Sequence, residues 1–355
     1  MKNHIRTGLA LSVFLQVLLV KWIGGYPELI ETYYSNGLYY YIAKGFRFAF
    51  GWIPFSVGDV FYTVAGILAV RFILLHGKII LKRPFFFLRE VLVVISLTYF
   101  VFHLFWGMNY YRRPLHKTLA LSDVYTTETL AGFTEKLIVK ANEIHLALTG
   151  NDTLPVVTPY GKGDVFKKTP EGFRQLSREF PELAYSPRSI KSSLYSTVLS
   201  YMGYSGYLNP FTNEAQINGL MPKFRIPLVS CHEEAHQLGY AAENEANFIG
   251  YLAAIYNNDL HFKYSGYLHG LKYCLNALSL EDPQKFKALY PRLNKGIVKN
   301  YLQSEQFWRS YQGNTEVIFK NSFDAFLKLN NQSAGIKSYA YIVPLLINFH
   351  KNNPL

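Results

Sequence analysis

Long apolar runs dominate the first third of the chain. Three stretches carry few charged residues: Gly8 to Ile23, Val57 to Leu75 and Val91 to Met108. About 20 apolar residues cross the hydrocarbon layer of a membrane, and soluble helices are seldom apolar on every side for so long. The pattern therefore predicts three transmembrane helices. A signal peptide is the alternative for the first run, because Lys2 and Arg6 precede it, but no small-residue cleavage site follows.

The segment between the first two runs, Tyr33 to Phe55, is rich in Tyr, Phe and Trp and carries Lys44 and Arg47. Aromatic side chains favour the headgroup region of a bilayer, so we expect an interfacial amphipathic helix here. Basic residues before the first run and between the second and third favour the cytoplasmic side. The chain after Met108 is then expected on the outer side of the membrane.

The remainder has the pattern of a mostly helical soluble domain, and we expect a membrane region over residues 1–110 and a second domain over 111–355. Asn151 to Pro187 is expected to be rich in loops, and Ile190 to Met202 to form a helix. Tyr207 to Ile217 carries β-formers and a proline, which predicts a hairpin or an edge strand. Seven helices are expected after it: Val229–Leu238, Glu243–Tyr256, Ser265–Leu278, Pro283–Tyr290, Val298–Tyr311, Thr315–Leu329 and Ser338–Phe349.

Composition agrees with a membrane protein. Charged residues make up only 17% of the chain, and the balance of 36 Lys+Arg against 24 Asp+Glu gives a net charge of +12. Such a charge suits anionic lipid headgroups, and since no nucleic-acid-binding motif accompanies it, we expect membrane lipid as a partner and no nucleic acid. Cys231 and Cys274 are interpreted as buried free thiols, with a single disulfide as the alternative.

The motif that carries chemistry is His232-Glu233-Glu234-Ala235-His236, an instance of H-E-x-x-H. Residues four apart lie on one face of a helix, so both imidazoles can bind one metal ion. Glu233 lies beside that face, where it can take a proton from a metal-activated water. We therefore predict a zinc ion held by His232 and His236, with Glu233 as the catalytic base. The alternative is a helix whose histidines make only structural hydrogen bonds.

A catalytic zinc site needs a third protein ligand and one position left for water. Glu243 follows the motif closely and is the favoured ligand, and Glu245 is the competing ligand. On a helix Glu245 would point about 200° away from Glu243, so the two should not bind the same ion. Asn247 shares a face with Glu243 and could hydrogen-bond a ligand from behind. For Glu243 the alternative reading is a first-turn acid stabilised by the helix dipole.

H-E-x-x-H followed by E-x-x-A-N resembles the gluzincin peptidases, whose ligand glutamate often begins E-x-x-A-D. This resemblance implies zinc ligands His232, His236 and Glu243, with Glu233 as the base; Asn247 departs from the family's Asp. Nearly the whole chain also resembles an uncharacterised bacterial membrane family, domain of unknown function 3810. The stretches that carry this likeness include Trp106 to Tyr110 and Asn209 to Ala215. This resemblance supports the fold and the metal and adds no known substrate. With the orientation given by the loop charges, we expect a multi-pass protein of the bacterial inner membrane with its catalytic domain on the periplasmic side.

Taken together, the fold class expected is mainly α: three N-terminal transmembrane helices followed by a zincin-like α+β metallopeptidase domain with a small sheet. Tyr207 to Asn218 is the candidate edge strand for an extended peptide or protein substrate. Candidates for stabilising an oxyanion are His261, Tyr264, Tyr267 and His269. The function expected is peptide-bond hydrolysis, and the alternative is an inactive zincin-like protein that binds envelope peptides or partner proteins. A transporter is disfavoured, because the spans lack a cluster of ionisable residues.

Overall fold

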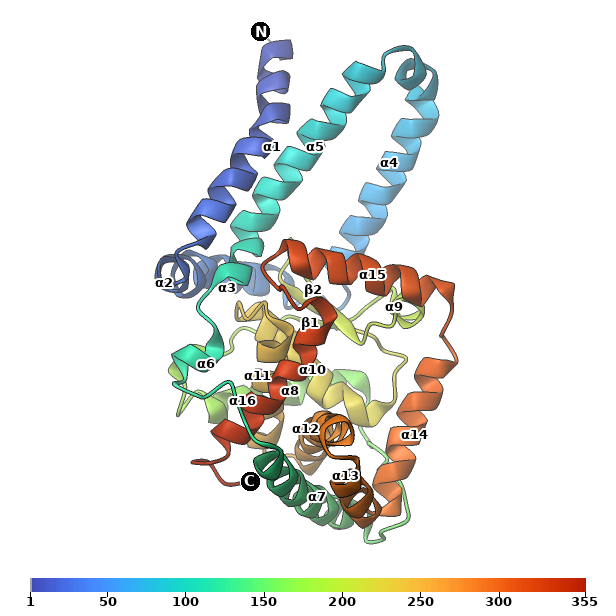
Figure 1. Cartoon of the computed structure of the whole chain (residues 1–355). Helices are drawn as coiled ribbons and strands as arrows, with labels where there is room; N and C mark the ends of the chain where they lie inside the picture. Colours follow the sequence, from blue (N-terminus) through green and yellow to red (C-terminus); the bar gives the residue numbers. More distant parts are fainter. Residues whose placement is uncertain (1) are drawn as a thin grey trace.

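The computed structural model describes residues 2–355; for Lys2, Lys78, Ile79, Leu81 and Ile336 it describes the backbone alone. Three helices, α1 (Lys2–Gly24), α4 (Val57–Lys82) and α5 (Pro84–Phe105), project from one face of a mainly helical domain (Figure 1). Each is long and apolar enough to cross a membrane. This agrees with the three spans expected from the sequence.

The third of these helices is displaced from its expected limits. It begins at Pro84, since proline suits the first position of a helix, and the Arg89 and Glu90 side chains that interrupt its apolar pattern pair with each other at 2.8 Å. Arg6 of α1 also binds Glu90 at 2.9 Å. At the other end, the helix stops at Phe105, and Trp106 has an extended φ of −156°. The run that continues to Met108 in the sequence is therefore split between two elements.

Three short elements connect α1 to α4: α2 (Pro27–Leu29), the π-helix η1 (Ile30–Leu38) and α3 (Tyr39–Phe50). The expected helix is present, but one of its two basic residues is buried. Lys44 is exposed, but Arg47 is 1% exposed and packs over the ring of Tyr185 at 5.0 Å. A guanidinium buried there is stabilised by its backbone carbonyl partners and by this ring contact.

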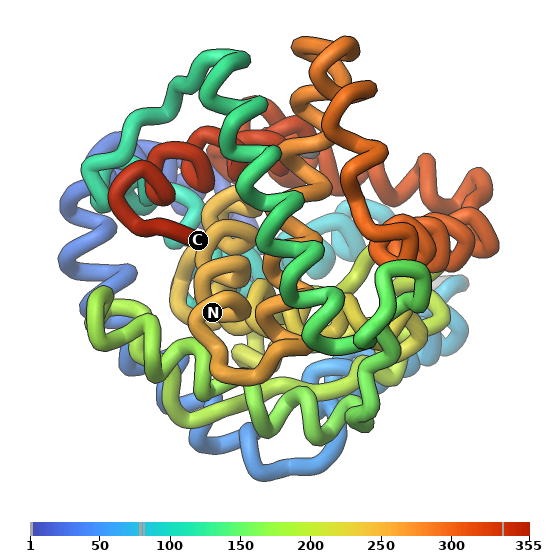
Figure 2. Tube along the Cα trace, turned by 90° about the horizontal axis from the view of Figure 1, so that it is seen from below, coloured from blue at the N-terminus to red at the C-terminus, as the bar shows by residue number. Residues whose placement is uncertain are grey.

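Helices make up most of the remaining domain. They are η2 (Gly107–Tyr111), α6 (Leu115–Thr118), α7 (Thr127–Thr149), α8 (Lys162–Leu176), η3 (Pro181–Leu183), α9 (Ser196–Met202), η4 (Lys223–Arg225), α10 (Ile226–Gln237), α11 (Glu243–Tyr256), α12 (Leu260–Glu281), α13 (Pro283–Leu289), η5 (Tyr290–Arg292), α14 (Lys295–Arg309), α15 (Asn314–Leu329), η6 (Gly335–Tyr341) and α16 (Ile342–Phe349). Seen from the end opposite the spans, α7 lies across the domain in front of α12 (Figure 2).

The loop expected over residues 151–187 contains a full helix, α8. Its buried positions Val165, Thr169, Phe173 and Leu176 recur at helical spacing, and Pro170 lies within the helix. Glycines, a proline and charged residues around these positions obscure the amphipathic pattern in the sequence. The helix packs against α11.

A small sheet contains β1 (Ile190–Ser192), β3 (Glu214–Ile217) and β2 (Gly206–Asn209), in that spatial order. β1 runs parallel to β3, whereas β2 pairs with it antiparallel, in register Gly206 to Ile217, and forms an edge. The expected hairpin is confirmed. The helix expected over residues 190–202 is wrong in its first part, because β3 pairs with residues 190–192 and the helix begins only at Ser196.

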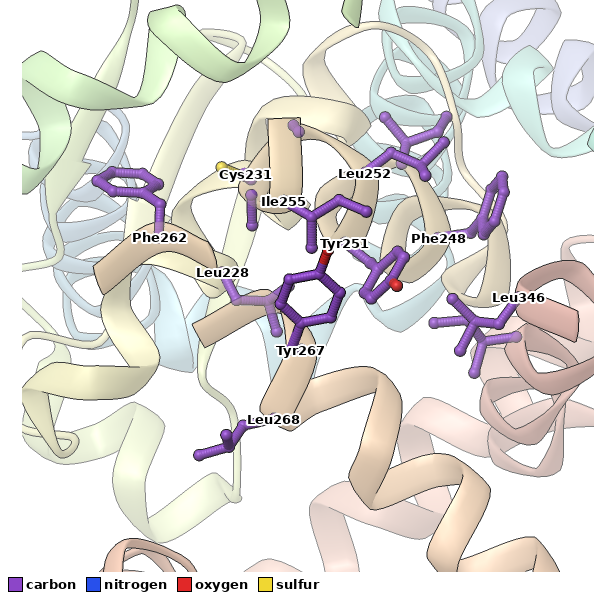
Figure 3. Packing of buried hydrophobic residues seen from close by; sticks show 14 of the residues in the cluster. Leu228, Cys231, Phe248, Tyr251, Leu252, Ile255, Phe262, Tyr267, Leu268 and Leu346 are labelled. Carbon is purple, nitrogen blue, oxygen red and sulfur yellow. The ribbon is translucent and has the colours of Figure 1, made fainter. Parts of the chain in front are cut away.

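The core is built on α10, α11 and α12. Side chains from these helices and from α16 meet in one apolar cluster, which includes Leu228, Cys231, Phe248 and Leu346 (Figure 3). Both cysteines are free and buried, which confirms the simpler interpretation. This packing fixes α10 and α11 against each other and so fixes the side chains that they present on their opposite faces.

Candidate metal centre

Helix α10 carries the H-E-x-x-H motif and is almost wholly buried. Its apolar side, with Leu228, Cys231 and Ala235, faces the core, and the helix gives way at Gly239, whose φ is +87°. A left-handed residue of this kind terminates helices, and glycine adopts the conformation without strain. The imidazoles of His232 and His236 consequently project from a rigid support.

Helix α11 approaches α10 unusually closely at Gly250. A Cβ at this position would lie 2.8 Å from the backbone N of His232 and 2.9 Å from its Cα, which real Cβ atoms essentially never show. Glycine therefore allows the two helices to pack in contact. The first residue of α11, Glu243, is thereby brought to the histidines of α10.

The three side chains converge. Oε2 of Glu243 lies 3.4 Å from Nε2 of His232 and 3.7 Å from Nε2 of His236. Tetrahedral zinc, with bonds of about 2.1 Å to nitrogen and oxygen, places neighbouring ligand atoms about 3.4 Å apart. The measured spacings fit that polyhedron. His232, Glu233 and His236 also present ligand atoms within 4.8 Å of one another.

The other ring nitrogen of His236 supports the same assignment. Its Nδ1 lies 2.7 Å from the carbonyl oxygen of Tyr240 and donates a hydrogen bond to it, which leaves Nε2 as the unprotonated atom in a neutral ring. The edge of Trp106 contacts the same imidazole, with ring centroids 5.9 Å apart. The ring is thus held on two sides with Nε2 facing Glu243.

Charge at the centre is strongly coupled. Burial would raise the pKa of Glu243, but hydrogen bonds from His232 and His236 outweigh it and hold that pKa well below its ordinary value. Burial likewise lowers the pKa of His236, but Glu243 overcomes this effect and raises it to about 9. The point where these atoms meet therefore favours positive charge, as a divalent cation site must.

Glu233 lies beside this point and is 3% exposed. Its Oε2 has no hydrogen-bond partner among the described residues, and burial raises its pKa to about 7. Gly206 of β2 packs on the same carboxylate, since a Cβ there would lie 2.6 Å from Oε1. An unsatisfied buried carboxylate with a pKa near neutrality has the properties of a general base.

Glu245, the competing ligand, points elsewhere, and Asn247 pairs with a histidine that is not one of the predicted ligands. Oε1 of Glu245 accepts a hydrogen bond of 2.7 Å from the backbone N–H of Leu115, and burial raises its pKa to about 7. Oδ1 of Asn247 accepts a hydrogen bond of 3.0 Å from Nε2 of His269. The structure therefore places Glu243 with the histidines, Glu245 on the other side of α11, and Asn247 beside a further histidine.

A cavity of about 440 Å³ contains the convergence point. Of the four residues considered for oxyanion stabilisation, His269 lines it; His261, Tyr264 and Tyr267 do not. Burial, together with the charges of His232, Arg225 and Lys272, lowers the pKa of His269 well below its ordinary value. A neutral ring that donates to Asn247 is therefore the form present at pH 7.

The sequence did not single out Tyr339, which η6 brings to the cavity wall. Burial and the charge of Glu243, to which its hydroxyl hydrogen-bonds, raise the pKa of Tyr339 well above its ordinary value. A phenol kept protonated beside the candidate metal ligands can donate to an oxyanion. No local signal marks it among 28 tyrosines. Trp106 and Tyr110 also line the cavity, and the motif around them could have marked them.

The stretch Tyr207 to Asn218, expected to be an edge strand, contains two strands. β2 forms an edge and lines the cavity through Gly206, Tyr207 and Leu208, whereas β3 is the central strand. Glu214 does not line it. Its carboxylate accepts hydrogen bonds from the backbone N–H groups of Val57 at 3.1 Å and Gly58 at 2.6 Å, at the start of α4. Glu214 is thus a buried link between sheet and span.

A helical domain with apolar N-terminal helices and a His/Glu cluster is the class that these observations define. The family model described as protein of unknown function (DUF3810) matches residues 34–347, and the chain belongs to this family. No curated protein and no solved structure matches the chain.

Proposed function

We propose that this protein is a membrane-anchored zinc metallopeptidase of gluzincin type that hydrolyses peptide bonds. The observation that carries the proposal is the convergence of His232, His236 and Glu243 at spacings suited to tetrahedral zinc, with the carboxylate of Glu233 beside them. All four line one cavity with an edge strand on its wall. The fold is correspondingly proposed to be zincin-like.

His232, His236 and Glu243 would hold the zinc ion, which when bound polarises a water molecule and a peptide carbonyl. Glu233 accepts the proton that the attacking water loses and passes it to the leaving nitrogen. Its raised pKa, about 7, suits both transfers. β2 supplies free backbone groups for pairing with an extended substrate, and Tyr339 donates a hydrogen bond to the developing oxyanion.

The test uses the full-length protein in detergent or nanodiscs, with metal analysis and a quenched fluorogenic peptide mixture. The wild type should bind one zinc ion and cleave peptides; Glu233→Gln should retain the zinc and lose activity by at least about 1000-fold. Glu234→Gln is the matched control. The carboxylate of Glu234, the next residue in the sequence, accepts a hydrogen bond of 2.6 Å from the hydroxyl of Thr169, and Glu234 does not line the cavity. Absence of stoichiometric zinc, or equal activity of Glu233→Gln and wild type, would refute the proposal.

We also propose that the three apolar helices cross the bacterial inner membrane and that the helical domain lies on the periplasmic side. The basic residues before α1 and between α4 and α5 support this orientation. Alkaline phosphatase fused after residue 355 should be active. An inactive fusion, with an active one in the α4–α5 connection, would reverse the topology.

A further inference from the structure

The candidate catalytic cavity borders one of the apolar helices. Phe102, which lies inside the span Pro84–Phe105, forms part of its wall. Trp106 follows at the end of α5 and contacts His236 at 5.9 Å between ring centroids. Only one layer of aromatic side chains therefore separates the His/Glu cluster from the end of a membrane-spanning segment.

The opposite wall is attached to another span. Tyr207 of β2 donates a hydrogen bond to Asp59 in the first turn of α4. The ring of Phe211, in the β2–β3 turn, lies 6.2 Å from Phe61 and 6.3 Å from Tyr62 of α4. Figure 1 shows α4 and α5 joined at their far ends and diverging toward the domain, so they meet the domain at different places.

Helix α15 supplies the third wall. Phe323 and Phe326 line the cavity, and Phe326 also packs against Phe102 with centroids 6.2 Å apart. The exposed side of α15 carries apolar side chains beside lysines: Ile318 is 62% and Leu329 is 78% accessible, and Lys320 and Lys328 are also exposed. The helix lies across the face of the domain from which the spans emerge (Figure 1). A helix with this pattern in this place is suited to lie in the headgroup region.

We propose that the cavity receives its substrate at the membrane surface, and that the substrate is a polypeptide anchored in the same bilayer, cut close to its anchor. This inference rests on the proposed function and adds the substrate class. The walls contributed by α5 and α15, together with the attachment of β2 to α4, place the entrance at bilayer level, where a substrate tethered in the membrane is held close to the cavity. The free edge of β2 lies beside that entrance, ready to pair with an extended juxtamembrane segment.

The position of the entrance can be measured directly in nanodiscs. Cys231 and Cys274 are both 0% exposed, so a fluorophore attaches selectively to an introduced cysteine. Leu329→Cys places it on α15, and Leu280→Cys is the matched control, because that leucine is 85% exposed at the end of α12, next to α13 at the far end of the domain. Lipids carrying a doxyl quencher near the headgroup should abolish most of the fluorescence at residue 329 and little at residue 280. Equal quenching at both positions would overturn the inference.

Substrate choice is tested with transmembrane peptides joined to the fluorogenic peptide sequences through a Gly/Ser spacer of about 3 or about 20 residues. The longer spacer holds the cleavable sequence roughly 25 Å from the membrane anchor. With the entrance at the membrane, the short-spacer peptide should be cleaved at least as fast as the long one, and Glu233→Gln gives the background. Cleavage of the long-spacer peptide alone would refute the location while leaving the peptidase intact. Cleavage of neither would refute the peptidase itself.

Discussion

Replacing Gly250 by alanine should separate the two helices that carry the candidate metal ligands. The added Cβ would lie 2.8 Å from the backbone N of His232, whereas ordinary contact begins at 3.4 Å, so the shortfall is 3.4 − 2.8 = 0.6 Å. The neighbouring atoms belong to a helix backbone, which cannot rotate away. The shift must therefore be taken up between α10 and α11, that is, between His232 and Glu243.

The expected loss has two parts. Overpacking of this kind costs about 1–3 kcal/mol of folding stability. A metal site tolerates only about 0.2 Å of displacement in its ligand distances, so a 0.6 Å separation should also weaken zinc binding by about 10- to 100-fold. Competition with a chelator of known affinity measures the second part, and thermal unfolding in detergent measures the first.

Gly132→Ala is the matched control for this substitution. Gly132 is exposed within α7, and a Cβ there would meet nothing within 4 Å, so alanine should stabilise the helix by up to about 1 kcal/mol. If Gly250→Ala binds zinc as tightly as the wild type and unfolds at the same temperature, the close packing of α10 on α11 does not position the ligands, and the reasoning fails.

Three further outcomes are expected. Gly206→Ala should reduce peptide hydrolysis by about 100-fold with zinc content unchanged, because its Cβ would lie 2.6 Å from Oε1 of Glu233 and 2.7 Å from the backbone oxygen of Gln216, and the carboxylate moves more easily than the strand; unchanged hydrolysis would show that β2 does not position the base. Burial lowers the pKa of His350 to about 4, below the 6.5 of the unfolded chain, so the unfolded state binds the extra proton and stability should fall as pH drops from 6.5 to 4, by up to about 3 kcal/mol. His350→Gln should lose less stability over that interval in thermal unfolding; an identical pH profile would contradict the assignment. Glu214→Gln should cost about 3–5 kcal/mol in the same assay, since it leaves the buried ammonium of Lys191, 3.5 Å away, without its counter-charge. The double change with Lys191→Met should recover much of that loss, and an unaltered single variant would argue against the link.

Local spacing accounts for the parts of the structure that the sequence predicted well. The apolar runs are long enough to define spans on their own, and residues 232 and 236 must share a helix face whatever surrounds them. The β2–β3 hairpin was also visible, since Asn209 and Pro210 mark its turn, with Asn209 accepting hydrogen bonds of 3.0 and 3.2 Å from the backbone N–H groups of Phe211 and Thr212.

The remainder depends on contacts between distant segments. Tyr339 reaches Glu243 only because the C-terminal chain folds back over the cavity. Arg47 looked interfacial because its neighbours are aromatic, but the carbonyl partners that allow its burial come from Ser186 and Gln237. β1 escaped notice because three residues in a parallel pairing carry no periodicity of their own.

Helix α3 ties the helical domain to the N-terminal helices through buried hydrogen bonds. Tyr39 donates a hydrogen bond of 3.1 Å, and Arg47 one of 3.3 Å, to the carbonyl oxygen of Gln237 at the end of α10. A fragment released by proteolysis after the third span would lose both donors and uncover the ring of Tyr185. The helical domain therefore cannot be separated from the preceding helices without loss of these buried contacts.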